Sequence, residues 1–177
     1  IEDLIEEETC VFTLTHSGYI KRLAASAYRA QGRGGRGVKG MATREEDYVE
    51  TVFTASTHDR IFFFTSFGRV YPRKGYQIPE AGRAARGTNI VNILPTDPGE
   101  RVVCMLPERE GAKFLFLCTK NATVKRMNLD IMKNIRRNGL RAINIDEDDE
   151  LISACVTDGQ RNILMATAAG YAICFAE

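Results

Sequence analysis

The sequence has few of the residues that build metal sites, disulfides and membrane spans. Its only histidines, His16 and His58, have no partner at the spacing of zinc ligands. No apolar run approaches the roughly 20 residues that would cross a bilayer. The five cysteines contain no CxxC pair and each stands in or beside an apolar strand-like run, so we expect free thiols in the core. They are Cys10, Cys104, Cys118, Cys155 and Cys174.

Catalytic groupings and long helices are also lacking. No pair of carboxylates, Ser/His/Asp set or metal cluster stands out, and the two histidines fit polar turn positions better than general bases. Only residues 24–28 and 129–135 could form one or two helical turns. The chain starts without Met on an acidic stretch, unlike a signal peptide, so we expect a piece of a longer protein. We therefore expect a folded, non-catalytic domain.

A repeat of about fifty residues runs through the chain. The segments 12–22, 63–71, 115–126 and 164–174 each contain an apolar run, a Thr, two further residues, a turn residue and a second short run. The turn residues Gly18, Gly68, Ala122 and Gly170 lie 48–54 residues apart. Runs rich in Phe, Val, Ile, Tyr and Thr around such a turn predict a β-hairpin. At Ala122 we expect the neighbouring Asn121 to take the left-handed conformation.

Two further segments recur in each repeat and complete about four strands. One follows the turn by 17–19 residues, at 37–41, 87–91 and 139–143, and the other is an apolar run with a polar start, at 47–53, 99–104 and 149–155. Four-stranded units at this period indicate an all-β, propeller-like array of blades. We expect one repeat domain over 1–177, with repeats at approximately 9–59, 60–110 and 111–160 and a partial fourth at 161–177. This makes about three blades and the start of a fourth.

Charge alternates in phase with the repeat, although the net charge is only +1. Residues 9–44 carry +7 with no Asp or Glu, and 60–96 and 111–145 carry +5 and +7. Residues 45–59, 97–110 and 146–160 carry −5, −2 and −6. Equivalent positions of a blade array face the same side, so we expect one basic band, suited to a polyanion, and one acidic band.

The segment from Gln31 to Gly37 holds four glycines and two arginines in seven residues. Glycine lets a backbone approach a partner closely, and arginine binds phosphate through two N–H groups, so the segment suits a sugar–phosphate backbone. A nucleotide-binding P-loop would need a Lys-Ser/Thr pair and a following helix, which are absent here. A flexible RGG tail would be a low-complexity run rather than one copy inside a repeat. Milder copies stand at 83–87 and 136–139.

The segment resembles the box of the C-terminal domain of the DNA gyrase A protein, usually written Q(R/K)RGG(R/K)G. Gln31, Arg33, Gly34, Gly35, Arg36 and Gly37 match, whereas Gly32 stands where a basic residue is usual. This departure removes one positive charge. The stretches 57–60, 68–71, 76–80, 85–87 and 90–95 resemble the same domain in the same order, so the resemblance covers essentially the whole chain.

The resemblance implies a fold, a function and partners. Members have a six-bladed β-pinwheel whose neighbouring blades exchange strands, and this chain would be its N-terminal portion. The basic rim would wrap duplex DNA without sequence specificity, so that the ATP-dependent type IIA topoisomerase introduces negative supercoils. The implied partners are the rest of the gyrase A protein and the gyrase B protein in a heterotetramer, in the bacterial cytoplasm at the nucleoid. No cofactor is expected here, because ATP and Mg²⁺ serve other parts of the holoenzyme.

The candidate DNA-binding residues are the box and the basic residues at equivalent places in the repeats. The box comprises Gln31, Gly32, Arg33, Gly34, Gly35, Arg36 and Gly37. The rim set is Lys21, Arg22, Lys39, Arg69, Arg73, Lys74, Arg83, Arg86, Lys125, Arg126, Lys133, Arg136, Arg137 and Arg141. Two alternatives stay open: the related domain of topoisomerase IV, which generally has a degraded box or none, and a propeller that scaffolds other proteins.

Overall fold

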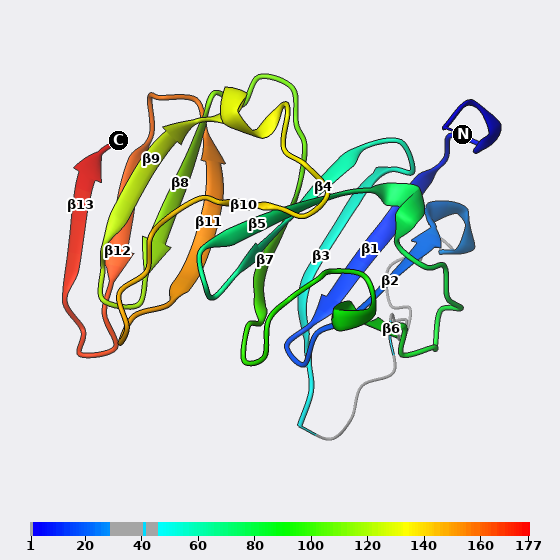
Figure 1. The fold of residues 1–177 in the computed structure, drawn as a ribbon, viewed down its shortest axis with the longest axis horizontal. Coiled ribbons are helices and arrows are strands. Elements are labelled where there is room, and N and C mark those ends of the chain that lie inside the picture. Colours follow the sequence, from blue (N-terminus) through cyan, green and yellow to red (C-terminus); the bar gives the residue numbers. More distant parts are fainter. Residues whose placement is uncertain (1, 29–40, 42–45) are drawn as a thin grey trace, which may run out of the picture.

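The computed structural model describes residues 2–28, 41 and 46–177, and it is built from β-sheets that follow one another along the array (Figure 1). The first sheet contains β1 (Thr9–Thr15), β2 (Tyr19–Ala24), β3 (Val49–Ser56) and β6 (Thr88–Asn89). The second contains β4 (Arg60–Thr65), β5 (Arg69–Lys74), β7 (Val102–Pro107) and β10 (Leu140–Arg141). The third contains β8 (Phe114–Thr119), β9 (Val124–Asn128) and β11 (Leu151–Thr157), and the fourth β12 (Asn162–Ala166) and β13 (Ala172–Ala176). The all-β, propeller-like fold expected from the sequence is confirmed.

Each of the first two sheets borrows its outermost strand from the next repeat. The order in the first sheet is β3-β1-β2-β6, and the order in the second is β7-β4-β5-β10. Ile20 pairs with Thr88, and Val70 pairs with Leu140, both antiparallel. All other pairs within these sheets are between strands of one repeat. Neighbouring blades are therefore tied together by main-chain hydrogen bonds as well as by side-chain packing.

The central hairpin of each sheet is closed by the same device. Thr15, Thr65, Thr119 and Thr167 accept a hydrogen bond at Oγ1 from the backbone N–H four residues later, over 3.1–3.3 Å. The turn residue three positions after each Thr has a positive φ, between 65° and 85°. Glycine adopts this conformation without steric cost, which explains its place in three of the four turns. At the third turn Ala122 itself is left-handed, so the expectation that Asn121 would take this role is wrong.

The second sheet is buried on both faces, which explains its run of phenylalanines. Side chains alternate along a strand, so Ile61 and Phe63 pack toward the first sheet while Phe62 and Phe64 pack toward the third. All four are at most 4% exposed. In the fourth sheet, by contrast, Leu164, Tyr171 and Ile173 are 61–77% exposed.

Helices are limited to five 3₁₀ turns in the described residues. They are η1 (Glu2–Leu4), η2 (Ala25–Ala27), η3 (Gly75–Gln77), η4 (Ile90–Asn92) and η5 (Leu129–Met132). None has the length or the apolar character of a membrane span. η2 and η5 stand where the sequence allowed one or two helical turns.

The five cysteines are free, but they are not all core residues. Cys10 is buried, and Cys104 and Cys118 are partly buried. Burial raises the pKa of Cys104 to about 11, which keeps its thiol protonated. Cys155 and Cys174 are exposed, contrary to the expectation from their apolar neighbours, because they lie on the less covered third and fourth sheets.

Candidate nucleic-acid interface

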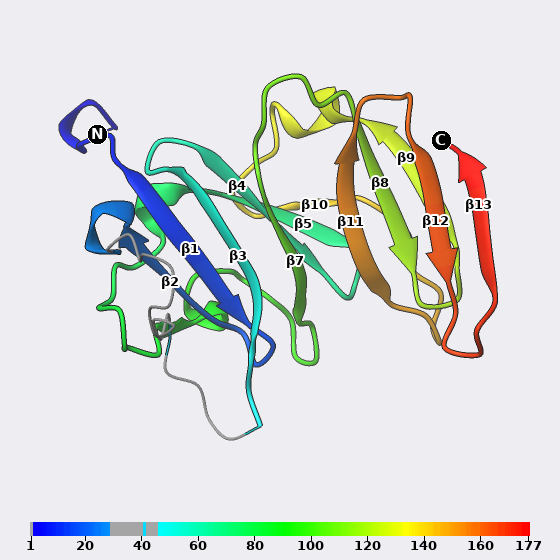
Figure 2. The same cartoon turned by 180° about the vertical axis from the view of Figure 1, so that it is seen from behind.

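The basic residues predicted from the repeat lie mainly on the second strand of each hairpin and in the segment that follows it. These strands, β2, β5 and β9, share one face of the array (Figure 1). The third strands β3, β7 and β11 lie on the opposite face, at the front of Figure 2. The box residues Gln31, Gly32, Arg33, Gly34, Gly35, Arg36 and Gly37, and Lys39, lie outside the described residues. The geometry below therefore concerns the rest of the rim.

The two described rim cations of the first repeat are engaged within the protein. Lys21 is 0% exposed, and its Nζ donates to the carbonyl oxygens of Gly82, Arg83 and Ala85 over 2.7–3.0 Å. Burial also lowers the pKa of Lys21. The Arg22 guanidinium lies 3.5–3.6 Å from the carboxylates of Glu8 and Glu80 and donates to the carbonyl of Ile78. Lys21 was expected to face DNA. The structure corrects this, because its ammonium instead holds a loop of the next repeat.

The second repeat also uses three of its cations internally. Arg69 forms an ion pair with Asp97, and its Nε lies 3.7 Å from the buried carboxylate of Glu100. The Lys74 Nζ lies 2.8 Å from Glu2 and donates to the carbonyl of His58. Arg73 is 4% exposed, and its guanidinium donates to the carbonyl oxygens of Ile93, Pro72 and Arg137.

The other two rim cations of this repeat lie nearer the solvent. Arg83 is exposed, and its side chain makes no hydrogen bond or ion pair among the described residues. The guanidinium of Arg86 stacks on the ring of Tyr19, with Cζ 3.5 Å from the ring centroid. Stacking on an aromatic face is favourable for a guanidinium, and the Arg86 Nε is buried with no hydrogen-bond partner among the described residues.

The third repeat leaves its cations at the surface. Lys125, Arg126, Lys133, Arg136, Arg137 and Arg141 are all exposed. Arg136, Arg137 and Arg141 donate no side-chain hydrogen bond and form no ion pair within the described part of the chain. Arg126 stands over the ring of Phe114 at 4.7 Å, Lys125 donates to the carbonyl of Ala142, and Lys133 is paired with Asp130. Among the described residues, the largest group of cations without an ion pair or a side-chain hydrogen bond thus lies in this repeat.

Acidic residues on the way into the third strands fasten the hairpin turns. Asp47 Oδ1 accepts from the backbone N–H of Ser17 and Tyr48, and Asp149 Oδ1 accepts from that of Asn121 and Glu150, over 2.8–3.0 Å. Burial raises the pKa of both aspartates, but these hydrogen bonds outweigh it and the net pKa is lowered. The sequence showed the acidic runs but not this role, which an Asp just before the strand signals only weakly.

Glu100 has the corresponding place in the second repeat. Its carboxylate is buried and accepts from the hydroxyl of Thr65 at 2.5 Å and from the backbone N–H of Asp97 at 2.8 Å. Thr65 is the residue that closes the hairpin turn of this repeat. A carboxylate therefore supports the turn in each of the first three repeats, which accounts for part of the alternating charge.

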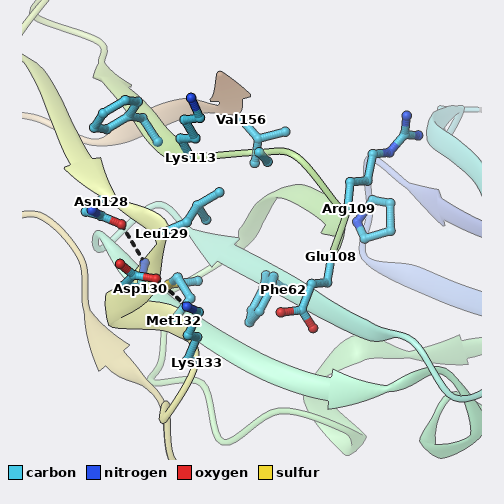
Figure 3. Close-up of a pocket in the computed structure, with 13 residues that line it drawn as sticks. Phe62, Glu108, Arg109, Lys113, Asn128, Leu129, Asp130, Met132, Lys133 and Val156 are labelled. Carbon is cyan, nitrogen blue, oxygen red and sulfur yellow. Dashed lines mark hydrogen bonds and ion pairs between the residues drawn. The ribbon is translucent and has the colours of Figure 1, made fainter. Parts of the chain in front are cut away.

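A cavity of about 360 Å³ lies between the second and third sheets and illustrates how charges are balanced there (Figure 3). Glu108, which lines it, is held by two hydrogen bonds of 2.8 Å from the guanidinium of Arg60. Asp130 accepts from Lys133, and both also line the cavity. Each acid here already has a cation. Among the described residues, no group of three His, Cys, Asp or Glu has the geometry to hold a metal ion.

The two histidines lie at loop tips, as the sequence predicted, and both are engaged locally. The His16 ring stacks on Tyr48 and its Nδ1 lies 3.3 Å from Glu50. His58 Nε2 donates to the carbonyl of Ile5 at 2.8 Å. His16 Nδ1 also lies 3.1 Å from the hydroxyl oxygen of Tyr48.

The sequence of this chain is similar to those of known proteins with a β-propeller domain. The family model of the DNA gyrase C-terminal domain, a β-propeller, matches residues 11–56, 59–106 and 113–158. The A protein of DNA gyrase from Clostridium acetobutylicum is 52% identical over all of this chain, and that from Streptococcus pyogenes M1 is 47% identical over 99% of it. The chain spans only 22% of the length of either relative.

Solved structures show the same fold. The C-terminal domain of a DNA topoisomerase IV superposes with a TM-score of 0.80 at 26% identity, covering 98% of this chain and 53% of that one. A gyrase A C-terminal domain superposes with a TM-score of 0.69 at 22% identity, covering 94% of this chain and 54% of that one. The family model alone accounts for most of the sequence, and this chain belongs to the DNA gyrase C-terminal domain family of β-propellers.

Proposed function

We propose that this chain binds and wraps duplex DNA along its basic face without selecting sequence, as part of a gyrase that introduces negative supercoils. One observation carries the proposal. Exposed cations without an acidic partner among the described residues lie on β9 and in the segment that follows it, and exposed Arg83 lies in the second repeat. Cations without acidic partners attract a polyanion at little desolvation cost and release its counterions on binding. The box arginines Arg33 and Arg36 would add further positive charge for DNA binding.

The energetics favour a path that bends. Curving a DNA site by 40–90° costs on the order of 1–6 kcal/mol, and several Lys/Arg–phosphate contacts can offset this cost. Because such contacts read the backbone rather than the bases, the binding would be insensitive to sequence. Strand exchange between the sheets would keep the face from flexing as the DNA follows it.

The remaining assignments follow from this role. The chain would have no catalytic step and no cofactor of its own, with ATP and Mg²⁺ serving other parts of the enzyme. Its partners would be duplex DNA, the rest of the gyrase A protein and the gyrase B protein, in the bacterial cytoplasm at the nucleoid. The corresponding domain of a topoisomerase IV is the second candidate, favoured by the superposition on that enzyme's C-terminal domain. The segment from Gln31 to Gly37 favours gyrase, because the related domain generally has a degraded box.

The first test measures binding of this chain to two unrelated duplexes of equal length between 50 and 200 mM salt. We expect equal affinities for the two sequences, and a slope of log K against log salt of about −4 or steeper.

The second test places Arg33→Ala with Arg36→Ala in the full-length gyrase A protein. Supercoiling is expected to be lost while ATP-driven relaxation remains. The control, Arg101→Ala with Arg161→Ala, removes the same charge from residues outside the rim set. Unchanged supercoiling in the box variant would refute the role of the box.

A further inference from the structure

One pair of arginines lies beside hollows that no described acidic residue lines. Arg73 and Arg137 together line three adjoining hollows of about 440, 220 and 200 Å³ beside β5 and the segment 91–95. The described lining includes the amides of Gln77, Asn92 and Asn138 but no Asp or Glu. This differs from the cavity of Figure 3, where each acid has a cation. Here the described lining supplies positive charge without a counter-charge.

Arg73 is fixed in place by carbonyl oxygens rather than by a carboxylate. Its Nε and Nη2 donate to the carbonyl of Ile93, and its Nη1 donates to those of Pro72 and Arg137, over 2.6–3.2 Å. A guanidinium has five N–H groups, so one on Nη2 remains unused by these contacts. Carbonyl dipoles satisfy hydrogen bonds but do not cancel the charge. Arg73 is thus a buried cation that is fixed by four hydrogen bonds and has one unused N–H group.

Arg137 supplies a second, exposed cation at the same place. Its carbonyl is held by Arg73, while its guanidinium is exposed and makes no contact with an acid among the described residues. The other cations at the edge of these hollows are already neutralised, Arg60 by Glu108 and Lys74 by Glu2. Burial and, to a smaller extent, the Arg137 charge lower the pKa of Arg73. Two like charges held together in this way favour a bound anion.

Building on the proposed function, we infer that Arg73 and Arg137 form a phosphate site that grips one backbone phosphate of the wrapped DNA. The smallest of the three hollows exceeds the space of several water molecules, at about 30 Å³ each, so a phosphate and its hydration fit. Arg137 would donate from the fork of its guanidinium, and Arg73 from its unused N–H. The preformed half of the site lowers the ordering cost of the contact.

The test follows the side-chain Nε–H signals of arginine by NMR while inorganic phosphate is added to this chain at constant ionic strength, with chloride as the reference. We expect saturable shifts of Arg73 and Arg137. Arg137→Gln should weaken phosphate binding about tenfold or more, because it removes a charge-assisted contact without disturbing the carbonyl that Arg73 holds. Arg109→Gln is the control, an exposed arginine lining the cavity of Figure 3, and should change phosphate binding less than about twofold.

A second measurement, with duplex DNA, distinguishes a phosphate of the DNA backbone from free inorganic phosphate. In duplex binding, Arg137→Gln should reduce the salt slope by about 1, and Arg109→Gln should leave it unchanged. No saturable shift, or an equal loss in both variants, would overturn the site. Saturable phosphate binding with an unchanged DNA slope in Arg137→Gln would overturn its assignment to the DNA backbone. Absence of any salt-dependent DNA binding by the unsubstituted chain would count against the proposed function instead.

Discussion

β2 and β9 carry the same Lys-Arg pair at equivalent places, Lys21-Arg22 and Lys125-Arg126. The two pairs differ in their burial and in their partners. Lys21 is buried under the loop that leads into β6, whereas Lys125 is exposed and has one carbonyl partner. Arg22 has two nearby carboxylates, and Arg126 has an aromatic ring. The difference comes from the neighbour. β2 pairs with β6 of the next repeat, while β9 pairs only with β8 in the described part of the chain.

The hairpin turns also differ in whether the next repeat packs against them. The largest effect on the free energy of unfolding is expected there. A Cβ on Gly68 would lie 2.4 Å from the carbonyl oxygen of Ile143, part of the segment that the third repeat lends to the second sheet. Gly170 has a similar φ of 85° but nothing within 4 Å of such a Cβ. Gly68→Ala should therefore lower the free energy of unfolding by about 4 kcal/mol, and Gly170→Ala by about 1 kcal/mol. Urea denaturation measures both, and equal losses would contradict the view that the lent segment clamps the turn.

An intermediate effect is expected from the two lysines. Lys21→Met leaves three carbonyl oxygens without their shared donor, and we expect it to cost about 2–3 kcal/mol of unfolding free energy. Lys125→Met removes a single contact at the surface and should cost less than about 1 kcal/mol. In duplex binding the order should reverse, with Lys125→Met weakening the affinity more. If Lys21→Met proved as stable as the unsubstituted chain, the buried ammonium would not be holding the 82–85 loop.

The smallest effect is a gain of stability at the third turn. Ala122 has a φ of 65°, a conformation that is unfavourable for residues with a Cβ. Ala122→Gly should raise the free energy of unfolding by about 0.5–1 kcal/mol, since relief of this strain exceeds the added entropy of glycine in the unfolded chain. Thermal unfolding of the two proteins side by side checks the sign. A loss of stability would mean that the Ala122 methyl group makes contacts outweighing the strain.

Much of the fold could be predicted because it is written in local patterns. The Thr and the turn residue that close each hairpin are three positions apart, and both recur at a constant place. The state of the cations depends instead on contacts between residues far apart in the sequence. Lys21 is buried by carbonyls 61–64 residues away, and Arg73 is held by Arg137, 64 residues away. Repetition thus predicts where a charge stands along the array, but the neighbouring repeat determines whether it reaches the solvent.

The pairing of β6 and β10 with the sheet of the preceding repeat has a consequence for folding during synthesis. During synthesis the N-terminal part emerges first, and β1, β2 and β3 can associate once residue 56 is available. The outer edge of β2 stays open until residues 88–89 arrive, and that of β5 until residues 140–141 arrive. The unit that repeats in the sequence is therefore not the unit that completes folding. Each of the first two blades is completed only when about thirty residues of the next repeat have been translated, so a ribosome that stalls at the boundary after either repeat leaves an unpaired strand edge exposed.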